Sequence, residues 1–249
     1  MKPPHNNATY VFCLLRAERA LSLRGAPDTV PGAGPLRLIR VDRGVWAAAA
    51  DAPVDRFNSA RLEAEFQDVE AISRHALAHA AVVEFLFRKA TVIPLKLLTL
   101  FSTDEKAVTE LRRQQRRVRS LFTELAGREE WAVRVVVEPQ DAQGPAAPTS
   151  GRAYLSEKRR LNRGGTPRTA LKKASLALSA LSRHAARVRK DVFPPPPPGR
   201  PLVVGASMLV PVKRRKQWKQ STLKIASTLA RDGDRLEVSG PWPPYHFVK

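Results

Sequence analysis

The last ten residues constrain the fold of this chain more than any other segment. Three prolines, a glycine and three aromatic residues stand side by side in Ser239–Val248. Proline fixes φ near −65° and removes a backbone donor, whereas glycine permits positive φ. We therefore expect a rigid extended tail, and neither an ordinary strand nor a helix. Its rings either pack on the domain that they follow or anchor a partner, and packing is favoured because the tail continues the last predicted core strand.

Length and composition favour a soluble folded protein of one large or two small domains. The chain has 249 residues, 43% of them hydrophobic, which is enough for a core. No apolar run approaches the roughly 18 residues needed to span a bilayer, and the polar start shows no secretory signal. Cys13 is the only cysteine, so an intrachain disulfide is excluded and we expect it to be a small core residue. These features predict a cytoplasmic protein.

The formal charge of +20 is unevenly distributed along the chain. Residues 151–249 hold 22 Lys and Arg against 5 Asp and Glu, whereas the first 150 residues hold 21 against 18. Such a field attracts polyanions or an acidic protein surface. The basic clusters are Arg112–Arg117, Lys158–Arg160 and Lys213–Lys216. Nucleic-acid binding is one hypothesis, but aromatic content is only 6% and the clusters are not interleaved with rings that could stack on bases.

Hydrophobic periodicity predicts an N-terminal α+β domain over residues 1–127 in ferredoxin-like order. We expect, in turn, a buried strand, a loop, a hairpin that turns at Gly44, a long helix and a short strand, at residues 10–16, 25–35, 36–50, 59–89 and 91–95. Asn58 or Ser59 is the expected N-cap of the long helix. A further helix over 103–126, capped by Ser102, ends at Gly127.

The remaining residues, 128–249, predict a second, basic domain with a modified ferredoxin-like arrangement. We expect strands at 130–138, 202–210 and 235–239, and helices at 154–161, 168–190 and 212–230. One strand of the ferredoxin-like order is missing from this pattern, near Pro194–Pro198. We interpret these five prolines as a stiff exposed spacer rather than a ligand for a proline-binding module. The predicted fold class is therefore α+β with two domains, each ferredoxin-like or a modified form of it.

No catalytic constellation is evident in the sequence. His75 and His79 are four residues apart on a predicted helix, a spacing that can bind a metal, but neither has the adjacent Glu of the zincin motif. A solvated or capped pair is the favoured interpretation. Gly32–Pro35 lacks the length and the Lys of a phosphate-binding loop. We expect no enzyme, no cofactor and no metal.

Several short segments resemble, in the same order, motifs of the gas vesicle accessory family GvpF/GvpL. The tail Gly240–Tyr245 matches its Gly-Pro-Trp-Pro-Pro-Tyr ending. Val92–Phe101 is similar to its Pro-Leu-Arg-Phe-Gly-Thr signature, with Lys96 in place of Arg and Leu97-Leu98 in place of Phe-Gly. The other similar segments are Tyr10–Arg16, His79 with Val82 and Val83, Glu130–Val135 and Gly151–Leu155. The usual Glu after the His is Ala80 in this chain.

The resemblance implies an accessory protein for gas vesicle assembly that associates with the hydrophobic shell protein GvpA and other gas vesicle proteins. A helper of this kind would cover apolar surface that the shell protein exposes before assembly. A basic nucleic-acid-binding module is the alternative. The candidate interface residues are Lys213, Arg214, Arg215, Lys216, Trp242 and Tyr245.

Overall fold

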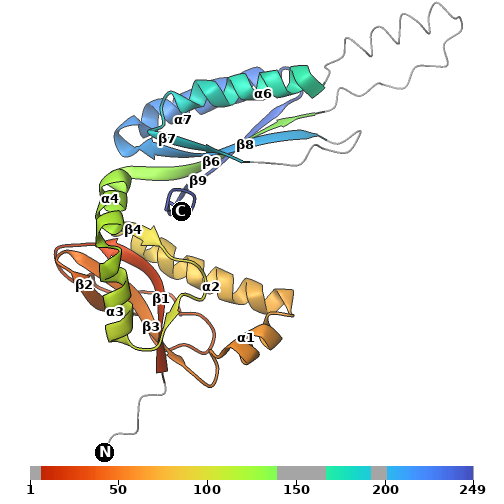
Figure 1. The fold of residues 1–249 in the computed structure, drawn as a ribbon. Helices are drawn as coiled ribbons and strands as arrows, with labels where there is room; N and C mark the ends of the chain where they lie inside the picture. The colour runs from red at the N-terminus through yellow and green to blue at the C-terminus, as the bar shows by residue number, and fades with distance from the viewer. Residues whose placement is uncertain (1–6, 139–166, 192–200, 249) are drawn as a thin grey trace, which may run out of the picture. The chain divides into compact units, whose positions relative to one another are not determined.

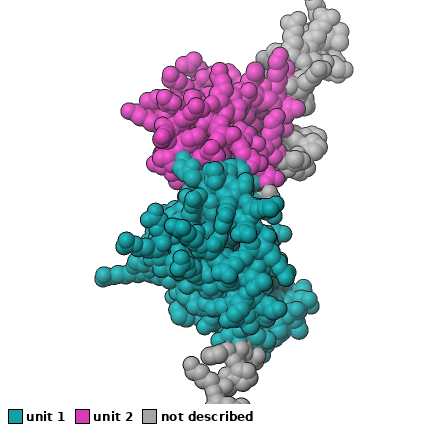
Figure 2. All heavy atoms as spheres, turned by 60° about the vertical axis from the view of Figure 1, so that its left-hand side comes forward, with its two compact units in different colours: residues 1–127, 243–249 teal, residues 128–242 magenta. Residues whose placement is uncertain are grey.

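The computed structural model describes residues 7–138, 167–191 and 201–248 (Figure 1). The chain divides into two compact units, which Figure 2 colours separately. Unit 1 comprises residues 1–127 and 243–249, and unit 2 comprises residues 128–242. We expected the second domain to run to residue 249, but the last seven residues belong to unit 1. The expected helix 154–161, the basic cluster Lys158–Arg160 and the spacer Pro194–Pro198 lie outside the described residues.

Unit 1 is built on an antiparallel sheet of order β2-β3-β1-β4, with β5 paired to β1. Its strands are β1 (Asn7–Arg16), β2 (Arg37–Asp42), β3 (Val45–Pro53), β4 (Thr91–Pro94) and β5 (Leu100–Phe101). The predicted hairpin is confirmed: β2 and β3 pair, and Gly44 has a φ of 70° in the turn. Cys13 is fully buried in β1 as expected, and burial raises the pKa of its thiol.

In the described part of unit 1, four helices accompany this sheet, because each of the two predicted helices is divided into two. They are α1 (Ser59–Glu65), α2 (Val69–Phe87), α3 (Asp104–Arg113) and α4 (Gln115–Leu125). The single helix expected over 59–89 is wrong because Asp68 caps a new helix: its carboxylate accepts from the backbone N–H groups of Glu70 and Ala71. The helix expected over 103–126 breaks at Gln114, and Thr103, not Ser102, is its N-cap.

The apolar core of unit 1 lies between β1 and α2. Tyr10, Phe12, Phe57, Val83 and Leu86 are among its buried members. Such burial removes large apolar surface from water, which is the main favourable contribution to folding.

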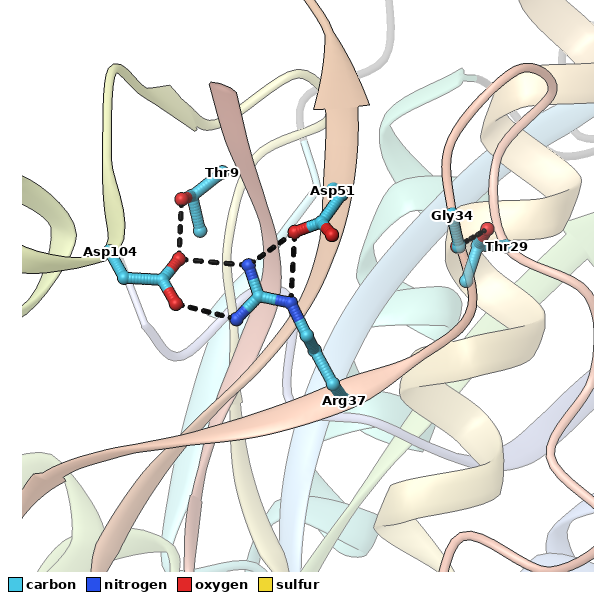
Figure 3. A network of polar contacts seen from close by, with 6 residues as sticks. All are labelled: Thr9, Thr29, Gly34, Arg37, Asp51 and Asp104. Carbon is cyan, nitrogen blue, oxygen red and sulfur yellow. Dashed lines mark hydrogen bonds and ion pairs between the residues drawn. The ribbon is translucent and has the colours of Figure 1, made fainter. Parts of the chain in front are cut away.

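An ion-pair network links β1, β2, β3 and α3 of unit 1 (Figure 3). The Arg37 guanidinium donates to Asp51 Oδ1 (2.6 Å from Nη2) and to both oxygens of Asp104 (2.7 and 2.8 Å). Thr9 donates its hydroxyl to the same Asp104 carboxylate at 2.6 Å. Hydrogen bonding from Arg37 lowers the pKa of Asp104. The planar fork of Arg37 thus holds strands and helix in one register.

Unit 2 is an antiparallel sheet of order β7-β8-β6-β9 with two helices. Its elements are β6 (Arg128–Val137), α6 (Pro167–Ser182), β7 (Arg187–Lys190), β8 (Leu202–Pro211), the 3₁₀ turn η1 (Val212–Arg214), α7 (Arg215–Ala230) and β9 (Arg235–Trp242). The helix expected over 168–190 is wrong after Ser182. Residues 187–190 instead form β7, an exposed edge strand that pairs with β8.

The tail is partly a strand, contrary to our expectation for Ser239–Val248. β9 continues through Gly240 and Pro241 to Trp242, which pairs with Glu130. Proline is tolerated there because β9 lies at the sheet edge, where one side of the strand donates no ladder hydrogen bonds. Gly240 is required because it has a φ of 132° and a Cβ would lie 2.9 Å from the Glu130 carbonyl oxygen.

Beyond Trp242 the tail becomes part of unit 1. Phe247 is only 2% exposed, and Tyr245 packs against the core cluster that contains Tyr10. Arg117 donates from Nη2 to the carbonyl oxygen of Val248 at 3.0 Å. These contacts fix the final residues on unit 1 through two rings and one hydrogen bond.

Candidate interaction surface

The two helices of unit 2 lie side by side on one face of its sheet (Figure 1). From α6, Ala174, Leu178 and Leu181 are buried in the core of this unit. From α7, Trp218 and Leu229 are buried in the same core, and Trp218 lies 4.9 Å from Trp131 between ring centroids. The inward side of each helix is therefore occupied, and the outward side is available to a partner.

The outward side combines exposed leucines with lysines. Leu176 and Leu223 are 63% and 68% exposed, and Leu171 is also exposed. Neither helix contains an acidic residue. The exposed lysines of these two helices are Lys172, Lys216, Lys219 and Lys224. We call this surface, with the three leucines, the helical face of unit 2. Large exposed apolar side chains within a field of one charge are typical of an interaction surface.

The predicted basic cluster adjoins this face, but its four members differ. Lys213 and Arg214 lie exposed in η1, and Lys216 is exposed in the first turn of α7. Arg215 instead pairs with Glu129 of β6: its Nε donates to Oε2 at 2.8 Å, and its Nη2 bonds Oε1. Because two parallel hydrogen bonds hold this guanidinium group, it stabilises the fold and is not available to a partner. Three of the four cations thus remain open to a partner.

Lys173, and Lys219 of the helical face, have partners within unit 2. Lys173 pairs with Asp232 at 2.5 Å and with the buried Asp234. Burial alone would lower the pKa of Lys173, but its hydrogen bonds to the two carboxylates outweigh that effect and raise the pKa. The ammonium of Lys219 lies 5.3 Å from the centre of the Trp131 ring, within cation–π range.

The two aromatic candidates occupy different places. Trp242 is 39% exposed and donates from Nε1 to the hydroxyl of Ser239 at 3.1 Å. It pairs with Glu130, while η1 follows Pro211, which pairs with Arg128. Trp242 and the basic cluster thus lie at the same end of the unit 2 sheet, on opposite sides of β6. Tyr245 belongs to unit 1.

The exposed leucines are residues that our sequence interpretation missed. A signal for one of them was present, because Leu223 lies off the apolar stripe of Trp218, Thr222 and Leu229 in a helix. Leu171, which we expected on the buried face of its helix, is 49% exposed.

We expected His75 and His79 to be a solvated or capped pair, and the solvated alternative is wrong because both side chains are buried. Nδ1 of His75 lies 3.1 Å from the carbonyl oxygen of Ala71, and Nδ1 of His79 lies 2.9 Å from the Tyr10 hydroxyl. In the described part of the chain, no three His, Cys, Asp or Glu side chains are grouped as metal ligands. None of the described helices combines the length and the apolarity needed to cross a bilayer.

Comparison with known proteins identifies the family. The family model described as "Gas vesicle synthesis protein GvpL/GvpF" matches residues 8–249. The chain belongs to the GvpL/GvpF family. A curated relative, gas vesicle protein L of a Streptomyces species, is 32% identical over 252 residues, which cover 96% of this chain and 92% of the relative. The predicted family membership is therefore confirmed, and the protein has a gas vesicle role.

Two crystal structures of gas vesicle protein GvpF share the fold. The Anabaena protein superposes with a TM-score of 0.69 at 16% identity, covering 98% of this chain and 96% of that chain. The Microcystis aeruginosa protein has a TM-score of 0.67 at 14% identity, covering 97% of this chain and 99% of that chain. At these identities the likeness concerns the fold alone, which is a mixture of helices and two antiparallel sheets.

Proposed function

We propose that this GvpL/GvpF protein is a non-enzymatic, cytoplasmic accessory factor in gas vesicle assembly. It associates with the shell protein GvpA and with other gas vesicle proteins. Family membership supports the gas vesicle role. The observation that carries the association is the helical face of unit 2, which has exposed leucines and no acidic residue on either helix.

The physical argument rests on what an unassembled shell subunit offers. A protein destined for a gas-facing wall exposes apolar surface, which aggregates unless another protein covers it. Leu176 and Leu223 supply apolar contact area, while Lys216 and Lys224 steer an acidic partner toward it. Lys213 and Arg214 extend the proposed surface at the end of the sheet where Trp242 is partly exposed. Arg215 is instead held by Glu129, and Tyr245 packs within unit 1.

Nucleic-acid binding is the alternative that the same charge allows. Its weakness is the lack of stacking rings on the helical face: α6 has no aromatic residue, and Trp218, the only one in α7, is fully buried. A polyanion would therefore bind through phosphate contacts only, with a steep dependence on salt.

The test is deletion of the gene in its gas-vesicle-forming host, followed by complementation. We expect few or no vesicles after deletion, recovery with the wild-type chain, and poor recovery with Leu176→Ser/Leu223→Ser. A matched control is Leu77→Ser, which changes an equally exposed leucine on α2 of unit 1. Normal vesicle number and shape in the deletion, with no paralogue present, would contradict the proposed role. Full recovery by the double variant would show that the helical face is not needed for this role.

We also propose that both units are ferredoxin-like and that the domain boundary follows Gly127. Numbered within each unit, both sheets have the order 2-3-1-4. In unit 2 the described elements run strand, helix, strand, strand, helix, strand, which is the ferredoxin-like order. In unit 1 the first helix is replaced by the loop 17–36, which makes that arrangement a modified one.

A further inference from the structure

A cavity of about 230 Å³ lies in unit 1, far along the chain from the helical face. The residues that line it come from the loop before β2, the turn after β3, and helices α1 and α2. Those on which the argument rests are Arg56, Phe57, Arg61, Leu62, Glu65 and His75. The lining is thus partly cationic and partly apolar, and four separate segments supply it.

Two guanidinium groups give the cavity its charge. Arg56 and Arg61 have no side-chain hydrogen bond or ion pair to any of the residues that the structure describes, in contrast to Arg37 of the same unit. Gly32 allows the loop to lie close to Arg56: it has a φ of 83°, and a Cβ there would be 3.1 Å from Arg56 Cδ and 3.2 Å from Nη1. Gly32 thus leaves room for the side chain of Arg56, which forms no ion pair with a carboxylate of the described residues.

His75 supplies a buried polar group to the same cavity. Its side chain is 2% exposed, and Nδ1 lies 3.1 Å from the carbonyl oxygen of Ala71. Because a carbonyl oxygen only accepts, Nδ1 carries a proton. The Phe66 ring packs edge-on against the imidazole at 5.4 Å between centroids, which fixes the plane of the ring. His75 is therefore held in one orientation by a hydrogen bond and a ring contact.

One carboxylate also lines the cavity and limits its positive charge. Glu65 Oε1 lies 3.9 Å from Nδ1 of His75, and its side chain is 42% exposed. Two permanent cations therefore face one carboxylate, which leaves a net positive cavity. The apolar walls come from Phe57, which is buried, and Leu62, which is half-buried.

We propose that this cavity is a binding site for a small anionic ligand that carries a carboxylate or a phosphate group. Arg56 and Arg61 donate to the oxyanion, because guanidinium groups match the geometry of both anions. Phe57 and Leu62 contact the apolar part of the ligand, and His75 is a fixed polar group in the lining. The site is independent of the proposed association through unit 2.

The experiment is isothermal titration of the full-length chain with two probes, glutarate and inorganic phosphate, at low ionic strength. We expect saturable binding of at least one probe. The probe that binds more tightly shows whether the site prefers a carboxylate or a phosphate group. Arg56→Gln and Arg61→Gln should each weaken binding about tenfold, because each removes a charge-assisted hydrogen bond. Amide spectra of unchanged dispersion verify that each variant remains folded.

Arg74→Gln is the matched control. Arg74 is exposed on α2, pairs with Glu70 at 3.2 Å, and does not line the cavity. Its loss removes the same charge from the same unit, so binding should stay within about twofold of the wild type if the site is specific. The absence of saturable binding for both probes would overturn the proposal. Equal weakening by Arg74→Gln would do so as well, because it would show general attraction to a basic chain.

Discussion

The backbone N–H of Leu98 donates to the hydroxyl oxygen of Tyr10 at 3.2 Å, and Leu98 does so from a left-handed conformation with a φ of 61°. It is the one described residue other than glycine with positive φ. The family signature to which this segment is similar has a glycine at this position. The chain therefore keeps a glycine-type turn with a leucine, at a cost of about 1–2 kcal/mol in backbone strain.

This strain predicts different effects on stability for two substitutions of Leu98. Leu98→Gly relieves the strain but loses packing and adds unfolded-state entropy, so we expect a melting temperature near that of the wild type. Leu98→Val brings a β-branched side chain into positive φ and should lower the free energy of unfolding by about 1–2 kcal/mol relative to Leu98→Gly. Thermal unfolding followed by circular dichroism measures both. A valine variant as stable as the glycine variant would show that the turn is unstrained.

A second prediction concerns pH and the buried His79. Burial lowers the pKa of His79 to about 4 from its ordinary value of 6.5. Between these values the unfolded chain binds a proton that the folded chain does not, so the free energy of unfolding should fall as pH decreases from 6.5 to 4. The loss approaches about 3 kcal/mol and levels off below the folded pKa.

The control for this effect is His79→Asn, whose amide oxygen can accept from the Tyr10 hydroxyl in place of Nδ1. Melting temperatures of the wild type and of His79→Asn are measured between pH 7.5 and 4. Because the Asn variant lacks only the contribution of His79, the difference between the two curves separates it from the contribution of the carboxylates. Parallel curves for the two proteins would mean that His79 does not couple folding to pH.

Much of unit 1 could be predicted because its signals are local. Gly44 marks a hairpin turn by residue type alone, and Asn58 caps α1 as expected by accepting from the N–H of Arg61. The break before α2 also has a local signal that we missed, because Asp68 is a good N-cap residue. We missed this break because the apolar periodicity continues across it, over residues 59–89.

The features that could not be predicted from the sequence depend on pairing between residues that are far apart in the chain. β7 has one apolar residue, Val188, and is a strand only because β8 offers its backbone groups. Arg215 reads as one cation of a basic run, yet its partner Glu129 lies 86 positions away. The packing of the tail on unit 1 could not be predicted either, since nothing in a proline-rich segment indicates which unit its rings will contact.

The pairing of Arg215 predicts that neighbouring basic residues differ in their effect on folding. Arg215→Gln leaves the Glu129 carboxylate, 12% exposed, without its partner and should lower the free energy of unfolding by about 1 kcal/mol, since Arg215 is itself partly exposed. Lys216→Gln should change it by less than about 0.5 kcal/mol. Urea unfolding of the two variants tests this difference, and equal effects would show that the ion pair adds nothing to stability.

Charge reversal on the helical face should act on association and not on folding. For Lys216→Glu/Lys224→Glu we expect an unchanged melting temperature, slower association with the shell protein, and a weaker dependence of the association rate on salt. The control Arg43→Glu/Arg116→Glu reverses two exposed charges of unit 1 and should leave the rate nearly unchanged. Association rates measured over a series of salt concentrations test whether these charges steer the partner. Identical salt dependence in the wild type and the first variant would exclude steering by this face.

The final prediction separates packing from partner binding in the tail. Phe247 is 2% exposed in unit 1, so Phe247→Ala should lower the free energy of unfolding by about 3–5 kcal/mol. Trp242 is 39% exposed on β9, so Trp242→Ala should cost only about 1 kcal/mol. Melting and shell-protein binding are measured on the same two proteins. If the tail serves packing, binding by each variant falls only as far as its folded fraction. A stable Trp242→Ala protein that no longer binds would instead make Trp242 an interface anchor, as buried tryptophans at the centre of interfaces are.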